Sequence, residues 1–192
     1  MNLNAKDGGH RKFIVVQLPE NAERSNFSTI SELSKQRIRT ISRSLIDAAK
    51  TQLLDNPDFG FRVLSFNRSN FKQWQDFNGE NIQALEQQFA SFETPLVDDW
   101  KEVDLLTEVM LLQGFPLDSR IETLPNFSLN MIRQIRCDFH AHSLYICLDP
   151  KINHKTIDGL VFTPEDIFVC LDSALSDETK MRLADHTNLR VI

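Results

Sequence analysis

The sequence predicts an α/β protein, and three observations support that prediction. Near the N-terminus, an apolar run, a long amphipathic stretch and a second apolar run follow one another, which is the β-α-β pattern. The last third of the chain alternates short apolar runs with turn residues. The composition, 41% hydrophobic and 25% charged residues, is ordinary for a globular protein. We expect a β-α-β piece at residues 1–75, a helical connector at 76–125 and a smaller α/β or α+β lobe at 126–192.

The first predicted element is a strand at residues 13–18. Its apolar residues are continuous and rich in β-branched side chains, which is typical of a strand covered on both faces. Pro19 ends this strand and Glu20 follows at its carboxyl end. We expect a second strand of the same sheet at residues 60–66.

Between these strands, the spacing of apolar residues predicts a long helix at residues 29–54, with Ser28 as its N-cap. Four basic residues fall on or beside the face opposite the apolar stripe: Lys35, Arg37, Arg39 and Arg43. These side chains are candidates for contacts with nucleic-acid phosphates, and a solvated helix face is the alternative.

The rest of the chain is predicted to be helical at first and then rich in strands. Two helices are expected at 81–92 and 100–112, the second ended by Gly114 and Pro116. Four strands and one further helix follow. The strands are expected at 130–136, 144–148, 167–171 and 189–192, and the helix at 176–186.

Charge, cysteine and hydropathy patterns exclude several classes of protein. The net charge of −6 argues against a chain that binds nucleic acid over its whole surface, although a local basic strip is compatible with it. The three cysteines form no CxxC pair and are expected to be reduced thiols, not a disulfide framework or a zinc site. No run approaches the roughly 18 apolar residues of a membrane span, so we expect a cytoplasmic protein without a membrane partner.

The sharpest candidate for ligand binding is Glu20. Ligands of open α/β sheets lie outside the carboxyl ends of the strands, and a carboxylate there can accept hydrogen bonds from both hydroxyls of a ribose. The alternative is a solvated strand end. The chain has only six glycines, which indicates that it carries no glycine-rich phosphate loop of its own.

Residues 4–20, NAKDGGHRKFIVVQLPE, resemble the stretch that follows the cofactor loop in the modification (Mod) subunit of type III restriction-modification systems, an adenine-specific DNA methyltransferase. Further segments resemble the family in the same order along nearly the whole chain. They are RIR at 37–39, GFRV at 60–63, SNFKQW at 69–74, DLL at 104–106, GFPL at 114–117 and VCLDS at 169–173.

The resemblance implies that residues 1–75 are the C-terminal piece of a Rossmann-like methyltransferase sheet. It implies that Glu20 holds the ribose of S-adenosylmethionine, and that the region beyond residue 75 serves subunit assembly. The implied partners are the remainder of the methyltransferase subunit, a second Mod subunit, the restriction nuclease subunit and, in the full complex, DNA.

Two motifs of the family have no match in this sequence. The catalytic Asp-Pro-Pro-Tyr motif is approached only by Asp149-Pro150-Lys151-Ile152, which lacks the second proline and the aromatic ring that stacks on a flipped adenine. The glycine loop for the cofactor is also unmatched. We therefore expect a C-terminal fragment that is inactive alone, has no catalytic residue of its own and does not hold the cofactor tightly.

Other interpretations of the sequence stay open. The chain is alternatively a stand-alone protein-interaction module derived from the same fold, and in either case an incomplete sheet predicts self-association. Asp138, His140 and His142 alternate as metal ligands on a strand do, but no further ligand is identifiable, so no metal is expected. Cys170 and Ser173 are expected to be structural, without a nucleophilic role. A dense set of aromatic residues predicts packing contacts in preference to base stacking: Phe61, Phe66, Phe71, Trp74 and Phe77.

Overall fold

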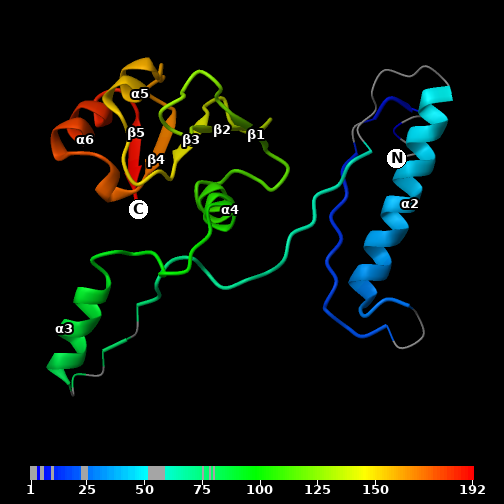
Figure 1. Ribbon diagram of the computed structural model, residues 1–192, viewed down its shortest axis with the longest axis horizontal. Coiled ribbons are helices and arrows are strands. Elements are labelled where there is room, and N and C mark those ends of the chain that lie inside the picture. The colour runs from blue at the N-terminus through cyan, green and yellow to red at the C-terminus, as the bar shows by residue number, and fades with distance from the viewer. Residues whose placement is uncertain are drawn as a thin grey trace. The chain divides into compact units, whose positions relative to one another are not determined.

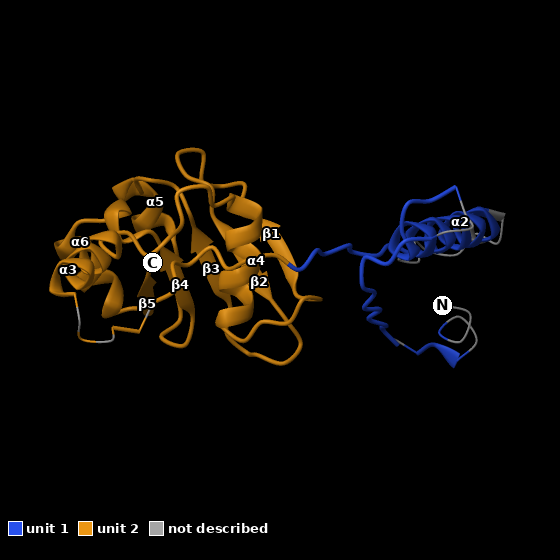
Figure 2. Cartoon of the chain, turned by 90° about the horizontal axis from the view of Figure 1, so that it is seen from below, with its two compact units in different colours: residues 1–66 blue, residues 67–192 orange. Residues whose placement is uncertain are grey.

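A computed structural model describes residues 4, 7–9, 11–22, 26–51, 59–74, 76, 77, 79 and 81–192 of the chain. The chain divides into two compact units, unit 1 from Met1 to Phe66 and unit 2 from Asn67 to Ile192 (Figure 2). Over the described residues, none of the helices combines the length and the apolar character that crossing a membrane requires.

Unit 1 is built around one long helix, α2 (Ile30–Thr51). The carboxylate of Glu32 accepts hydrogen bonds from the hydroxyl and the backbone N–H of Ser28, at 2.7 and 3.1 Å, and these bonds lower the pKa of Glu32. The helix begins at Ile30, and the hydroxyl of Thr29 accepts from Glu32 N at 3.2 Å. The N-cap is therefore Thr29, one residue after the predicted Ser28. Among the described side chains of α2, Ser42 is the one that is buried, while Ile30, Leu33 and Leu45 are half-buried. The predicted apolar stripe of this helix is therefore only partly covered.

The two predicted strands of unit 1 are absent. Residues 13–18 and 60–66 are irregular chain, and every residue from 11 to 20 is exposed. Ile14 and Val16 are 83% and 87% exposed, and Phe66 is fully exposed. The prediction was wrong for this chain because a strand forms only beside a neighbour that completes its hydrogen bonds, and nothing described in unit 1 pairs with either run. Among the described residues of unit 1, Asn21 and Thr29 form an isolated β-bridge.

Unit 2 contains an open five-stranded sheet in which the strands follow their order in the chain (Figure 1). The strands are β1 (Arg120–Thr123), β2 (Arg133–Arg136), β3 (Leu144–Cys147), β4 (Ile167–Cys170) and β5 (Asn188–Val191). The pairs β1–β2 and β2–β3 are antiparallel, and the pairs β3–β4 and β4–β5 are parallel. The sheet is therefore mixed, with two βαβ crossovers in its C-terminal half.

Helices cover both faces of this sheet. Helix α4 (Glu102–Leu112) buries four of its residues in one apolar cluster, which also contains Ile135, Ile146 and Val169 of the sheet. On the other face, α5 (His154–Gly159) and α6 (Asp177–Ala184) join a second cluster around Phe168. A short 3₁₀ turn, η1 (Asp172–Ala174), precedes α6. Unit 2 thus has the helix–sheet–helix layers of an α/β fold.

Helix α3 (Ile82–Ser91) differs from the other helices of unit 2 because none of its residues is buried. The indole of Trp74 packs against Phe89 and Phe92, with ring centroids 5.3 and 5.5 Å apart. Backbone hydrogen bonds join residues 70–72 to residues 95–97. We call the segment between them, which contains α3, the α3 arm.

The coarse prediction of an α/β protein is confirmed by the mixed five-stranded sheet and its helices. The observed division follows Phe66, whereas the sequence suggested a boundary near residue 75. Helix α4, which lies within the predicted connector at residues 76–125, contributes to the core of unit 2. Strand β1 and helix α5 were not predicted.

Candidate functional site

Glu20 lies in the exposed, irregular part of unit 1, just before α2. Its backbone N–H donates to Leu18 O at 2.8 Å, and its carbonyl accepts from Ile30 N at 3.0 Å. Neither of the two cavities described below is lined by Glu20. The contact of this carboxylate with a cofactor ribose stays a prediction.

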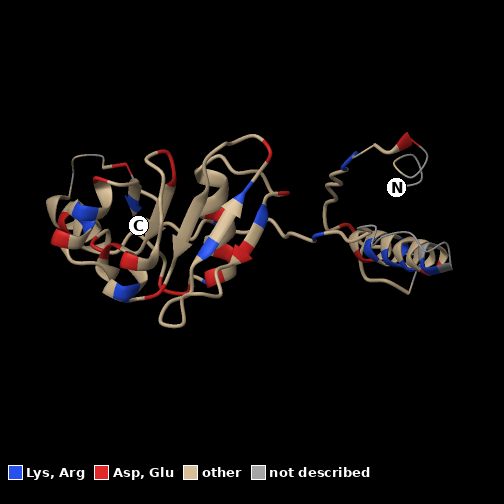
Figure 3. Ribbon diagram, turned by 90° about the horizontal axis from the view of Figure 1, so that it is seen from above, with Lys and Arg blue, Asp and Glu red and all other residues tan. Residues whose placement is uncertain are grey.

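The four predicted basic residues all lie on α2, whose ribbon carries the blue of Lys and Arg at several positions in Figure 3. Arg37, Arg39 and Arg43 are exposed, and Lys35 is half-buried. Arg39 and Arg43 are one helical turn apart and line the same hollow, whereas Lys35 and Arg37 do not line it. The structure thus separates this predicted set into a pair at a cavity and two residues elsewhere on the helix.

This hollow, the α2 cavity, has a volume of about 300 Å³. It is lined by Arg39, Ser42, Arg43 and Ile46 from α2 and by Phe59, Gly60 and Phe61 from the chain after it. Ser42 gives no signal of binding in the sequence, because a helix serine normally bonds to the carbonyl four residues back.

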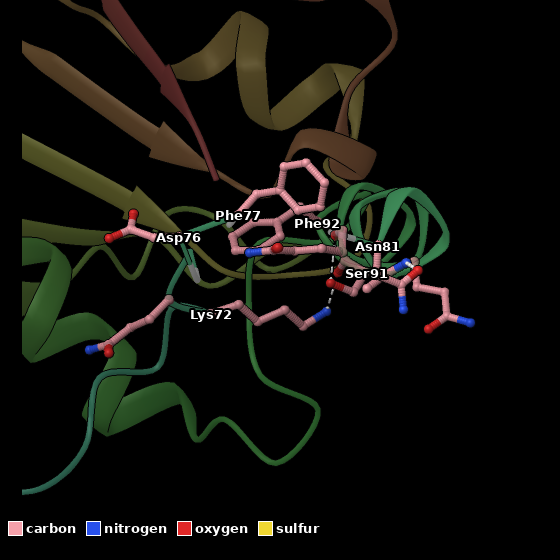
Figure 4. Close-up of a pocket in the computed structure, with 10 residues that line it drawn as sticks. Lys72, Asp76, Phe77, Asn81, Ser91 and Phe92 are labelled. Atoms are coloured by element: carbon pink, nitrogen blue, oxygen red, sulfur yellow. Dashed lines mark hydrogen bonds between the residues drawn. The ribbon is translucent and has the colours of Figure 1, made fainter. Parts of the chain in front are cut away.

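A larger cavity of about 630 Å³, the α3 cavity, lies between α3 and the chain before it (Figure 4). Its wall is made of Lys72, Gln73, Asp76, Phe77 and Asn81, together with Ala84, Gln87, Gln88, Ser91 and Phe92. The wall is thus mainly amide and aromatic, the groups that hydrogen-bond and stack on ligands.

Lys72, the basic residue in that wall, already forms hydrogen bonds within the protein. The ammonium of Lys72 donates to Ser91 O at 2.7 Å and to Thr94 O at 2.8 Å, so it satisfies carbonyls at the C-terminal end of α3. The amide of Asn81 accepts from Ala84 N at 3.2 Å and caps the other end. The α3 cavity therefore has the character of a contact surface and lacks a paired acid and base for catalysis.

Glu108 of α4 fixes the start of unit 2. Its carboxylate accepts hydrogen bonds from the hydroxyl of Ser69, from Asn70 N at 2.7 Å and from Asn70 Nδ2 at 2.8 Å. Burial alone would raise the pKa of Glu108, but these hydrogen bonds together outweigh burial and lower it. Ser69 and Asn70, the first two residues of the SNFKQW segment at 69–74, thus hold the α3 arm against α4.

The carboxyl ends of the parallel strands carry Asp149 and Asp172, at the edge where α/β proteins bind ligands. Asp149 Oδ2 accepts from Asn130 Nδ2 at 2.8 Å and from Met131 N at 3.0 Å. Asp172 Oδ1 accepts from Lys180 Nζ at 2.7 Å. Both carboxylates are therefore held by structural partners. In open α/β sheets, ligands bind in the crevice where the strand order reverses and two crossover connections leave in opposite directions. The strands of this sheet follow their order in the chain, so it has no such point.

The remaining candidates have structural surroundings. The rings of His140 and His142 lie 4.9 Å apart, and both pack against Phe115. Over the part of the chain that the structure describes, no three His, Cys, Asp or Glu residues are grouped so as to hold a metal ion. Burial raises the pKa of Cys170 to about 12, which leaves its thiol protonated and unsuited to nucleophilic attack.

The five aromatic residues of the stacking hypothesis are divided between the units. Phe61 and Phe66 belong to unit 1, and the other three belong to unit 2. Within unit 2, Trp74 packs on α3, and Phe71 packs against the cluster that contains α4. These contacts favour the packing interpretation for Trp74 and Phe71.

The α2 cavity is thus the site in which unpaired basic groups, a hydroxyl and aromatic rings meet, and the α3 cavity is a larger amide-lined surface. No protein-family model, curated protein or solved structure matches the chain significantly.

Proposed function

We propose that the chain is the C-terminal portion of a type III restriction-modification Mod subunit, inactive alone. In this proposal, unit 1 adds strands to a Rossmann-like sheet that binds S-adenosylmethionine, and unit 2 serves subunit assembly. The observation that carries the proposal is the pair of exposed apolar runs, residues 13–18 and 60–66, together with their resemblance to the family.

These runs have the composition of buried strands but none of the burial. Ile14, Val15 and Val16 are between 66% and 87% exposed, and Val63 and Leu64 are about half exposed. Burial of apolar surface stabilises a protein by roughly 25 cal/mol per Å². Covering these exposed side chains would therefore lower the free energy of the chain. A sheet edge from another polypeptide would satisfy their backbone groups and cover their side chains by strand addition.

Helix α2 supports the same proposal. In a β-α-β unit the crossover helix packs its apolar face on the sheet. Ile41 and Ile46 are 54% and 39% exposed. A helix that carries such residues without covering them gains stability when a sheet is placed against it.

Glu20 would then follow the strand formed by residues 13–18. Its carboxylate would lie at the carboxyl edge of a parallel sheet, where it would accept hydrogen bonds from the two hydroxyls of the cofactor ribose. The sequence matches neither the Asp-Pro-Pro-Tyr motif nor the glycine loop, so in this proposal the chemistry belongs to the remainder of the subunit.

The test is reconstitution with the N-terminal portion of a type III Mod subunit that carries the Asp-Pro-Pro-Tyr motif and the glycine loop. We expect radiolabelled S-adenosylmethionine to methylate duplex DNA only when both polypeptides are present. Amide hydrogen exchange at residues 13–18 and 60–66 is expected to slow in the mixture. Robust methylation by this chain alone, or no complex with such a portion, would contradict the proposal.

The contribution of Glu20 is tested by Glu20→Gln in the same mixture. Loss of the carboxylate is expected to raise the KM for S-adenosylmethionine by about tenfold, because one hydrogen bond to a charged acceptor is worth about 1.5–3 kcal/mol. Glu86→Gln, an exposed glutamate on α3, is the matched control and is expected to leave the KM unchanged. Equal effects of the two substitutions would remove Glu20 from the cofactor site.

A second candidate function is a stand-alone interaction module, favoured by α3. Ile82 and Phe89 are 69% and 61% exposed on a helix without a buried residue, while unit 2 has its own core on both faces of its sheet. In this case unit 2 alone would account for binding. Deletion of unit 1 would then leave partner binding intact, whereas the fragment proposal requires unit 1.

A further inference from the structure

We propose that the α2 cavity binds an aromatic phosphate ester about the size of one nucleotide. The inference goes beyond the proposed function and does not depend on it, because it uses only residues of unit 1 in the arrangement that the chain already has.

The charged side of the cavity is a single stripe of α2. Arg39, Ser42 and Arg43 are spaced three and four residues apart, which places them on one face of the helix with about 5–6 Å between neighbouring Cβ atoms. Within the described ranges, neither guanidinium has an ion-pair or hydrogen-bond partner. Two unpaired guanidinium groups on one face suit the oxygens of a phosphate, which guanidinium groups bind through paired N–H donors.

The acid that follows Arg43 on the described part of α2 is engaged elsewhere. Asp47 lies one turn beyond Arg43 and pairs with Lys50 at 3.7 Å. Arg39 and Arg43 therefore present positive charge to the cavity without a carboxylate already bound to them, even though the chain as a whole has a net charge of −6.

Ser42 is the second, independent observation that points to a ligand. It is 7% exposed, and its hydroxyl oxygen has no hydrogen-bond partner among the described residues. Two other hydroxyls of the same helix bond to the carbonyl four residues back, Thr40 to Gln36 O at 3.0 Å and Ser44 to Thr40 O at 3.1 Å. Buried hydroxyls are almost always satisfied, so Ser42 lacks a partner that an anion in the cavity would provide.

The other wall of the cavity is apolar. Phe59 and Phe61 come from the chain after α2, and Ile46 lies one turn beyond Ser42. Phenyl rings and a branched aliphatic side chain form a surface on which a base or another flat ring can stack. The volume of about 300 Å³ lies at the lower end of the range for small-molecule sites and suits one ring with one phosphate.

The same chemistry has two sources, a free mononucleotide and one nucleotide within a strand. Calorimetric titration of the full chain at low salt distinguishes them, with adenosine monophosphate in one arm and a single-stranded octanucleotide in the other. We expect saturable binding of adenosine monophosphate with a Kd below about 1 mM. Weaker binding of the octanucleotide than of the monophosphate identifies the free nucleotide as the source, and tighter binding identifies the strand.

Both ends of the ligand must contribute. Adenosine lacks the phosphate and ribose 5-phosphate lacks the ring, and each is expected to bind at least about tenfold more weakly than adenosine monophosphate. Equal affinity for ribose 5-phosphate and adenosine monophosphate would overturn the role of the phenyl rings. No saturation by either the monophosphate or the octanucleotide up to about 5 mM would overturn the site itself.

Substitutions on α2 distinguish specific binding in the cavity from non-specific attraction of the ligand to a basic helix. Arg43→Gln is expected to weaken binding of adenosine monophosphate at least about tenfold, and Ser42→Ala severalfold. Arg37→Gln removes an equally exposed charge outside the cavity and is expected to change the Kd less than about twofold. Equal losses from Arg37→Gln and Arg43→Gln would mean non-specific attraction and would contradict the proposal.

A readout without substitutions guards against effects on folding. In nuclear magnetic resonance spectra of the unaltered chain, the Nε–H signals of Arg39 and Arg43 are expected to shift on titration with adenosine monophosphate, and that of Arg37 is expected to stay in place. Shifts of all three to the same extent would overturn the site. Methylation is not part of any of these measurements, so they succeed or fail independently of the reconstitution with a Mod portion.

Discussion

Unit 1 and unit 2 contain runs of nearly the same composition with opposite fates. Strand β4 (Ile167–Cys170) is buried along its whole length between two neighbouring strands. Residues 13–18 are as apolar and as rich in β-branched side chains, yet all of them are exposed. The difference lies in the neighbours, because β3 and β5 complete the hydrogen bonds of β4 while nothing described pairs with residues 13–18. An apolar, β-branched sequence therefore favours a strand, but the strand forms only where neighbouring strands complete its hydrogen bonds.

The largest test of this difference is a cavity in the core of unit 2. Phe168→Ala removes a fully buried ring and is expected to lower the free energy of unfolding of unit 2 by about 3–5 kcal/mol. Phe66→Ala in unit 1 is the control, since that ring is fully exposed, and a change within about 0.5 kcal/mol is expected. Urea denaturation followed by fluorescence reports on unit 2, which contains both tryptophans, Trp74 and Trp100.

A smaller effect is expected at the polar centre of unit 2. The amide of Asn130 is 7% exposed, donates to Asp149 Oδ2 and Lys151 O, and accepts from Asn153 N and the hydroxyl of Thr156. Asn130→Ala removes four hydrogen bonds at once, one of them buried and three part-buried, and should cost about 2–3 kcal/mol of unfolding free energy.

Asn188→Ala, at an exposed strand position, is the matched control for Asn130→Ala. A loss at Asn130 no larger than the loss at Asn188 would show that the network does not hold the β2 and β3 ends together.

The sequence predicts most of the helices and the strands of unit 2 well. Helices α2, α3, α4 and α6 and strands β2 to β5 lie within a few residues of their predicted positions, because periodicity and capping are local signals. Strand β1 has one half-buried residue and three exposed ones, so its sequence shows no alternating apolar pattern. Helix α5 has six residues, which is too short for a helical period to be recognised.

The site was predictable only in part. Arg39 and Arg43 stand out as charges on a helix, but the cavity beside them depends on where Phe59 and Phe61 lie, which no spacing rule specifies. Glu108 bonds to Asn70 across 38 residues of chain, and such long-range pairs leave no local trace.

Glu108 provides the third test, by pH. Because hydrogen bonds from Ser69 and Asn70 lower its pKa in the folded protein, its contribution to stability is present above the ordinary carboxyl pKa near 4.5 and is lost as the pH falls below that value. Glu108→Gln should therefore lower the unfolding free energy of unit 2 by about 1–2 kcal/mol at pH 7 and by much less at pH 3. Denaturation curves at the two pH values check this, and an equal loss at both would exclude the carboxylate as the anchor of the α3 arm.

The smallest expected effect lies in unit 1. Val16→Ser is expected to change the unfolding free energy of the isolated chain by less than about 0.5 kcal/mol, because this side chain is already 87% exposed. The same substitution should weaken assembly with a Mod N-terminal portion, where the run would be buried. A loss above about 1 kcal/mol in the isolated chain would mean that residues 13–18 are covered there, and the contrast between the units would disappear.

The order of the strands in unit 2 has a consequence for how the unit forms. Every strand pairs with the strand that precedes or follows it in the chain, so each pairing closes only the loop between consecutive elements. Loop closure of this kind is entropically cheap, and sheets with such local topology fold faster than sheets with distant pairings. During synthesis, unit 2 is therefore able to grow one strand at a time, and β4 gains its second neighbour only when β5 emerges.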